Sequence, residues 1–82
     1  MKIHNLTQLT PACPSQWEAD TEDGRKVYVR YRWGKLRVGV GDDIDEAVAS
    51  SRYNYVWTGG GAYSGVMTTK EMLERTGLEV DE

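Results

Sequence analysis

Hydrophobic and polar residues alternate most regularly over residues 15–41, a pattern that indicates half-buried β-strands. Two turns divide this stretch. The first is the segment EDG, which ends at Gly24, the position at which a three-residue hairpin loop favours glycine. The second is Gly34–Lys35, which has glycine at its first position, as a two-residue type II′ turn requires. We therefore predict a three-stranded antiparallel meander.

The two turns independently place the same apolar set on one face of the meander. The first sets Trp17 opposite Val29, and the second sets Trp33 opposite Leu36. Because side chains alternate between the two faces, a slip by one residue in either hairpin would destroy this agreement. The predicted inner face consists of Trp17, Ala19, Val27, Val29, Tyr31, Trp33, Leu36, Val38 and Val40.

Two short helices are predicted after the meander. Residues 42–51 open with a capping pattern at Asp43, followed by an amphipathic stretch of about two turns. Residues 68–77 open with the same kind of pattern at Thr68, and Gly77 is suited to end the helix.

The remaining segments predict less regular structure. Residues 53–58 are rich in strand-favouring side chains, and residues 59–66 form a glycine-rich loop. Residues 1–14 show no clear period and contain two prolines, so we expect an irregular lead-in. The tail, residues 78–82, is expected to add a short edge strand or to fray. The predicted fold class is a single α+β domain with a small antiparallel sheet.

Composition supports a small globular protein. The 82 residues include 39% hydrophobic and 28% charged side chains, a balance typical of one folded domain. Cys13 is the single cysteine, which excludes an intramolecular disulfide and fits a reducing compartment. With no long apolar run and no signal-peptide pattern, we expect a cytoplasmic protein and no membrane partner.

Positive charge gathers in one segment although the net charge is −3. Residues 25–37 contain six Lys and Arg side chains and no acid. Acids gather instead at residues 18–23, at residues 42–46 and towards the C-terminus. This segregation indicates a local basic surface on an acidic protein.

The outer face of the predicted meander carries that basic surface. In the predicted register Arg32 lies opposite Arg37, and Arg30 lies opposite Gly39. Like charges directly opposite each other destabilise a sheet, so we expect a compensating interaction. The candidate binding residues on this face are Tyr28, Arg30, Arg32, Arg37 and Gly39.

Two explanations for this surface remain open. In the first, acids of residues 42–46 or of the C-terminal tail fold over the arginines and neutralise them. In the second, the arginines form a platform for phosphate or carboxylate, because a guanidinium binds either group with a planar fork of donors. Tyr28, beside the bare backbone of Gly39, would then add an aromatic surface.

The glycine-rich loop Thr58–Gly65 is a second candidate site. Its glycines allow backbone N–H groups to approach a ligand, and Tyr63 offers a ring for stacking or for contact with a protein. The loop fits neither G-x-G-x-x-G, because Ser64 occupies the last required position, nor a P-loop. A plain connection between two elements is the alternative interpretation.

Residues suited to catalysis or to metal binding are scarce. His4 is the single histidine, and Cys13 shows no feature of an activated thiol. The acids of residues 42–46 lack the spacing of a calcium-binding loop and are explained by helix capping. We therefore expect no enzyme activity, no cofactor and no metal site.

The run PSQWEADTEDGRKVYVRYRWGKLRVGVG, with TTKEMLERTGL near the C-terminus, resembles a group of small uncharacterised proteins from phages and bacterial genomes. The resemblance covers about half of the chain, mainly residues 14–41, and carries no known activity or residue role. It implies a setting in which compact acidic proteins often inhibit or sequester a host component, in the host cytoplasm.

Taken together, these features predict a non-catalytic binding protein. The leading hypothesis is a phage-type inhibitor that binds an acidic or mixed surface of a host defence protein through the arginine face and the Tyr63 loop. The alternatives are a binder of a small phosphorylated ligand, such as a nucleotide signal, and an accessory structural subunit that self-associates. A pI of about 5.1 argues against long nucleic acid as the partner.

Overall fold

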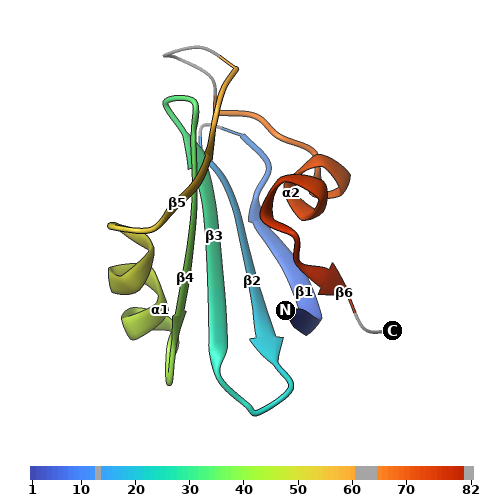
Figure 1. The fold of residues 1–82 in the computed structure, drawn as a ribbon, viewed down its shortest axis with the longest axis vertical. Helices are drawn as coiled ribbons and strands as arrows, with labels where there is room; N and C mark the ends of the chain where they lie inside the picture. Colours follow the sequence, from blue (N-terminus) through green and yellow to red (C-terminus); the bar gives the residue numbers. More distant parts are fainter. Residues whose placement is uncertain (13, 61–64, 81–82) are drawn as a thin grey trace.

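The computed structural model describes residues 1–12, 14–60 and 65–80, and these ranges form one six-stranded sheet with two helices. The elements are β1 (Lys2–Thr10), β2 (Ser15–Thr21), β3 (Lys26–Arg32), β4 (Lys35–Gly41), α1 (Ile44–Ser51), β5 (Tyr55–Thr58), α2 (Thr69–Thr76) and β6 (Glu79–Val80). The strand order across the sheet is β5-β4-β3-β2-β1-β6 (Figure 1). All neighbours are antiparallel except β1 and β6, so the predicted α+β class with an antiparallel sheet is confirmed.

The hairpin formed by β2 and β3 has the predicted register. Trp17 pairs with Val29, and Ala19 pairs with Val27. Gly24 adopts a φ of 87°, the left-handed conformation that this loop requires. Apolar alternation and one glycine were therefore sufficient to place this hairpin.

The hairpin formed by β3 and β4 corrects the predicted turn. Its central residues are Trp33 and Gly34, with φ of 57° and 69°, as in a type I′ turn. The pairing is shifted by two residues, so that Tyr31 rather than Trp33 lies opposite Leu36. Because side chains alternate with a period of two, this shift leaves the strand residues on their predicted faces. Trp33, predicted to be internal, lies in the turn and is 51% exposed.

Residues 1–14, predicted to be irregular, contain the strand β1. It pairs antiparallel with β2, but its register shifts at two points along the strand. Asn5 lies in the first irregularity with a φ of 55°, and its amide donates to the carboxylate of Asp20 at 2.9 Å. Such bulges break the alternation of apolar side chains, which explains why the sequence pattern did not indicate a strand.

Both helices begin at the predicted capping residues. Asp43 accepts a hydrogen bond from the backbone N–H of Glu46 at 2.9 Å, and Thr68 accepts one from Glu71 at 3.1 Å. Gly77 ends α2 with a φ of 76°. Within the ranges that the structure describes, no helix is long and apolar enough to span a bilayer.

The main core lies between α2 and the inner face of the sheet. Trp17 is fully buried, and its indole N–H donates to the hydroxyl of Thr69 at the start of α2 at 3.0 Å. Complete burial of apolar side chains such as Trp17 is the dominant stabilising contribution in a small domain. The buried cluster consists of Ile3, Trp17, Ala19, Val27, Val29, Tyr31, Leu36, Val38, Met67, Met72 and Leu78.

The helix α1 packs against the opposite, outer face of the sheet, over β3 and β4. Gly39 and Gly41 make this contact possible. A Cβ at Gly39 would lie 1.9 Å from the carbonyl oxygen of Ala47. A Cβ at Gly41 would lie 2.6 Å from the backbone nitrogen of Ala47. The helix backbone therefore rests directly on glycine positions of β4.

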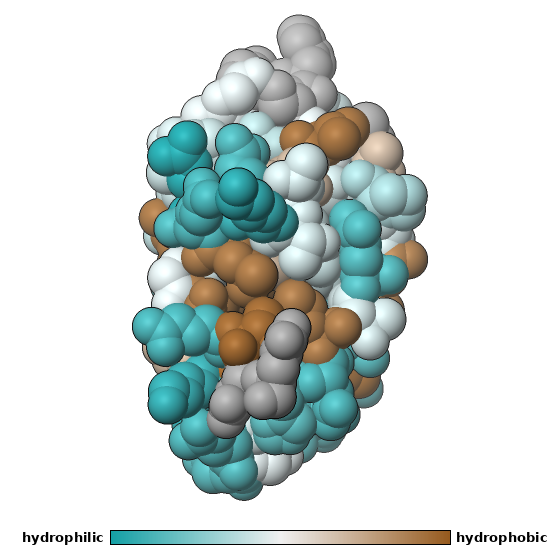
Figure 2. Space-filling model, turned by 90° about the vertical axis from the view of Figure 1, so that its right-hand side faces the viewer, coloured by the Kyte–Doolittle hydropathy of each residue, from teal (hydrophilic) through white to brown (hydrophobic). Residues whose placement is uncertain are grey.

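The side of the molecule formed by β1, β6 and α2 has a mixed surface. Apolar side chains gather in the middle of this side between hydrophilic regions above and below (Figure 2). The large apolar residues exposed on β1 and β6 are Leu9, at 47%, and Val80, at 36%. Among the described residues of β1, β6 and α2, Arg75 is the single arginine.

Candidate functional site

The helix α1 covers one end of the outer face, and two predicted site residues lie beneath it or next to it. Tyr28 pairs with Gly39 and is 6% exposed. Its hydroxyl donates to the side-chain oxygen of Gln16, and burial raises the pKa of the Tyr28 hydroxyl. Gly39 is buried against Ala47. The structure therefore does not bring Tyr28 or Gly39 to the surface where we predicted them to meet a ligand.

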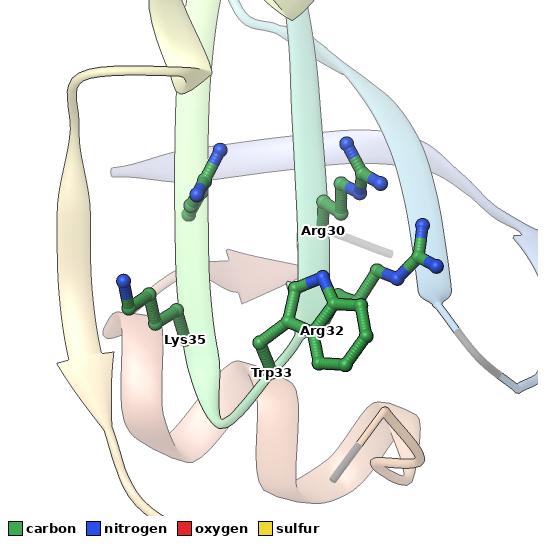
Figure 3. A pocket seen from close by; sticks show the side chains of 5 residues that line it. Arg30, Arg32, Trp33 and Lys35 are labelled. Carbon is green, nitrogen blue, oxygen red and sulfur yellow. The ribbon is translucent and has the colours of Figure 1, made fainter. Parts of the chain in front are cut away.

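The turn end of the same face carries four cations, Arg30, Arg32, Lys35 and Arg37, which we call the cationic patch. Arg30 pairs directly with Arg37, and Arg32 pairs directly with Lys35. Together with Trp33 they line a pocket of about 170 Å³ (Figure 3). The structure thus brings together the three predicted arginines and adds a lysine that the predicted register had not placed there.

The cationic patch has no carboxylate partner within the described part of the chain. The two ion pairs found there use other cations, Arg25 and Lys26. Carboxylates from residues 42–46, which one explanation had placed over the arginines, instead accept backbone N–H groups at the start of α1. Asp81 and Glu82 lie outside the described residues.

Aromatic rings, rather than acids, accompany three of these cations. The Cζ atom of Arg32 lies 4.8 Å from the ring centroid of Trp33, and that of Arg37 lies 4.7 Å from the centroid of Tyr55. Arg37 also donates to the Tyr55 hydroxyl at 3.1 Å, and Nζ of Lys35 lies 5.3 Å from the same ring. Cation–π contacts attract the cations but leave their net charge uncompensated.

Arg30 contributes a buried donor without a partner. Its Nε atom is buried and forms no hydrogen bond to any described residue. A buried unsatisfied donor costs about 1–3 kcal/mol, and more when it is charged, so such groups are rare. Arg37, directly opposite, adds like-charge repulsion. An anionic group bound by the Arg30 guanidinium would offset the like-charge repulsion between Arg30 and Arg37.

Three residues of the site, Trp33, Lys35 and Tyr55, were not predicted as binding residues. The sequence Trp33–Gly34 lacks the Asn-Gly signature of a type I′ turn, which led to the shifted register and hid Lys35. Tyr55 reaches the patch because β5 pairs with β4, a long-range pairing that no local pattern specifies. Tyr63, the predicted aromatic residue of the glycine-rich loop, lies outside the described residues.

The side chains that could bind a metal ion are scattered over the described ranges. No cluster of three or more His, Cys, Asp or Glu side chains there is placed to hold a metal ion. His4 lies in β1 opposite Asp20, away from the cationic patch in the strand order, and Cys13 is outside the described residues. The chemistry that the site offers is electrostatic binding of an anion by guanidinium groups.

No protein-family model matches this sequence, and neither the curated proteins nor the solved structures contain a significant match. The resemblance to small phage proteins therefore remains an expectation. Any function has to be inferred from the geometry and the charge of the cationic patch.

Proposed function

We propose that this protein is a non-catalytic binding protein whose cationic patch binds an acidic surface of a partner protein. One observation carries the proposal: two cation pairs face each other across β3 and β4 without a carboxylate partner among the described residues. The sheet tolerates this arrangement at a cost in stability. A complementary acidic surface would remove that cost on binding.

The size of the pocket supports a single anionic group as the part that enters it. Its volume of about 170 Å³ is smaller than the roughly 300 Å³ at which small-molecule sites begin. A carboxylate or phosphate group fits between the guanidiniums, whereas the rest of the partner lies outside. Arginine suits this task because its planar fork binds two oxygens at once.

The resemblance to small phage proteins favours one purpose for this binding. A compact acidic protein that covers an acidic surface of a host protein would act as a stoichiometric inhibitor, and a defence protein is the target that we propose. The local positive field of the cationic patch would accelerate encounter with such a surface at low salt.

A small phosphorylated ligand is the second candidate, and the pocket between Arg30, Arg32 and Arg37 favours it. This ligand would place a phosphate in the pocket and leave the remainder exposed. A nucleotide that binds the folded state raises the Tm at millimolar concentration. A thermal-shift comparison of nucleotides with chloride at equal ionic strength therefore separates this candidate from a protein partner.

The proposal is tested with a fluorescent glutamate-rich peptide as the acidic probe. Fluorescence anisotropy at low salt is measured for the wild type and for R30Q/R32Q. The control variant K2Q/K70Q removes the same charge from exposed positions in β1 and α2. We expect binding by the wild type and by the control, loss of most affinity in R30Q/R32Q, and weakening of all binding at high salt.

Two results would contradict the proposal. One is equal binding by R30Q/R32Q and K2Q/K70Q, which would mean that attraction is unspecific. The other is unfolding of R30Q/R32Q while K2Q/K70Q stays folded, which would identify these arginines as structural. Thermal unfolding of each variant, followed by circular dichroism, distinguishes the two.

A further inference from the structure

Trp33 holds a backbone conformation that a bulky residue rarely adopts. Its φ of 57° lies in the left-handed region, at the first central position of the β3–β4 turn. This position favours Asn, Asp or Gly, because a Cβ and a large side chain are strained there. Strained residues of this kind cluster at functional sites.

The same residue is one of the large apolar side chains that face solvent. Trp33 is 51% exposed, at the tip of the hairpin. It borders the cationic patch, with the guanidinium of Arg32 over its ring (Figure 3). Tyr55, 49% exposed, lies beside the patch on β5. Trp, Tyr and Arg are the residue types that dominate the affinity of protein interfaces.

We propose that Trp33 is the apolar anchor of the interface formed by the cationic patch. The partner is then a protein surface in which acidic side chains surround an apolar recess. The recess receives the indole, and the acids contact Arg30, Arg32, Lys35 and Arg37. This inference rests on the proposed function and adds to it the kind of surface that is recognised.

Charge and shape together favour a partner surface in which acidic side chains surround an apolar recess. Four cations without a carboxylate partner in the described ranges favour acids on the partner. An exposed indole gains affinity only when it enters an apolar environment, because removal of apolar area from water supplies the free energy. A purely acidic surface would leave the indole in water. The strained turn presents the ring at the tip of the hairpin, where it reaches a recess first.

The test uses two glutamate-rich synthetic peptides of equal length and charge. One has a single central Leu, and the other has Ser in its place. The variant W33N removes the indole and creates the Asn-Gly pair that a type I′ turn favours. Affinities are measured by isothermal titration calorimetry, and a short single-stranded oligonucleotide serves as a third probe.

We expect the wild type to bind the Leu peptide roughly tenfold more tightly than the Ser peptide. In W33N this preference should disappear, because the affinity for the Leu peptide falls to that for the Ser peptide. We also expect the Tm of W33N to rise by roughly 4–8 °C, because the strain of the turn is relieved. A residue kept for binding rather than for stability behaves in this way.

Each other outcome overturns a defined part of the proposal. If neither peptide binds the wild type, the proposed function fails, and this inference fails with it. If both peptides bind equally, or if W33N retains the preference, the cationic patch binds acids but Trp33 is not the anchor. A lower Tm in W33N would show that the indole stabilises the fold. Tighter binding of the oligonucleotide than of either peptide would replace the acidic protein with nucleic acid.

Discussion

At the scale of single residues, Ser15 shows how a small side chain joins distant segments. It is fully buried at the start of β2, and its hydroxyl donates to the carbonyl of Pro11 at 2.7 Å. The same oxygen accepts the backbone N–H of Met67 at 3.1 Å. One hydroxyl thus fixes the chain that leads into α2 against the first strand of the meander.

We expect S15A to lower the free energy of unfolding by about 1–3 kcal/mol, because the N–H of Met67 would stay buried without its partner. Urea unfolding monitored by tryptophan fluorescence measures this change. S50A, at an exposed position of α1, is the matched control. Equal stabilities of S15A and S50A would show that the Ser15 hydroxyl is dispensable.

Asp20 makes part of the stability depend on pH. The Lys26 ammonium, which donates at 2.6 Å, and then the Asn5 amide lower the pKa of Asp20 below its usual 3.8. Because the folded-state pKa is the lower one, this contribution is present above about pH 4 and is lost as the pH falls through the folded-state value.

The variant D20N should therefore be less stable than the wild type at neutral pH, and the difference should shrink towards about pH 2. Urea unfolding at both pH values measures it. A difference that is the same at both would show that the carboxylate charge of Asp20 has no role. Above neutral pH we expect D20N to remain less stable than the wild type.

The face of the sheet on which a side chain lies was predictable from the sequence wherever the alternation of apolar and polar residues alone decides it. Trp17 lies on the inner face as predicted because its hairpin has the predicted register. Leu36 and Val38 also lie there, because period-two alternation survives the register error of two residues in the β3–β4 hairpin. Trp33 was misplaced, because its turn conformation contradicts its own preference. The sequence carried no local signal for a strained tryptophan, and strain of this kind is seen only in the structure.

At the scale of secondary structure elements, helix ends were predictable and helix placement was not. Capping side chains at Asp43 and Thr68 mark both starts, because they satisfy backbone groups within their own segments. The face that α1 covers depends instead on Gly39 and Gly41 of β4, which lie outside the helix itself. Two glycines at alternate positions of one strand were the available signal for close approach of another backbone.

We expect G39A to destabilise the fold by about 3 kcal/mol, because the added methyl group would meet the backbone of α1. A Cβ there would lie 1.9 Å from the oxygen of Ala47 and 2.4 Å from the nitrogen of Ser51. The control G24A tests backbone conformation alone, since φ is +87° and no atom lies within 4 Å of a Cβ.

Thermal and urea unfolding of the two variants separate crowding from backbone strain. G24A should cost about 1 kcal/mol, less than G39A. If G24A were the more destabilised variant, α1 would not rest on Gly39 as described. Loss of the α1 contact in G39A would also expose Tyr28, which near-ultraviolet circular dichroism detects.

At the scale of the whole molecule, the segregation of charge was the feature of the site that the sequence predicted best. It indicated an arginine-rich outer face, and the structure places Arg30, Arg32 and Arg37 together on that face. The sequence left open whether the chain's own acids cover the patch. The structure shows that Asp43 and Glu46 accept backbone N–H groups at the start of α1, as the capping pattern predicted, and do not cover the arginines.

Replacing Lys35 by Glu should stabilise the fold at low salt. Lys35 lies directly opposite Arg32, so K35E converts a repulsive pair into an attractive one. We expect a gain of about 0.5 kcal/mol at low salt from urea unfolding. In molar salt, where the Debye length is about 3 Å, the gain should vanish. A loss of stability in K35E would mean that Lys35 has a structural role.

Binding of an anionic group by the cationic patch can be followed residue by residue in NMR spectra of the arginine side chains. The Nε–Hε cross-peaks of the ¹⁵N-labelled protein are followed during titration with the glutamate-rich peptide. We expect the cross-peaks of Arg30, Arg32 and Arg37 to shift together and saturate, while those of Arg25, Arg52 and Arg75 stay in place. Shifts spread evenly over all arginines, or no shifts at all, would contradict it.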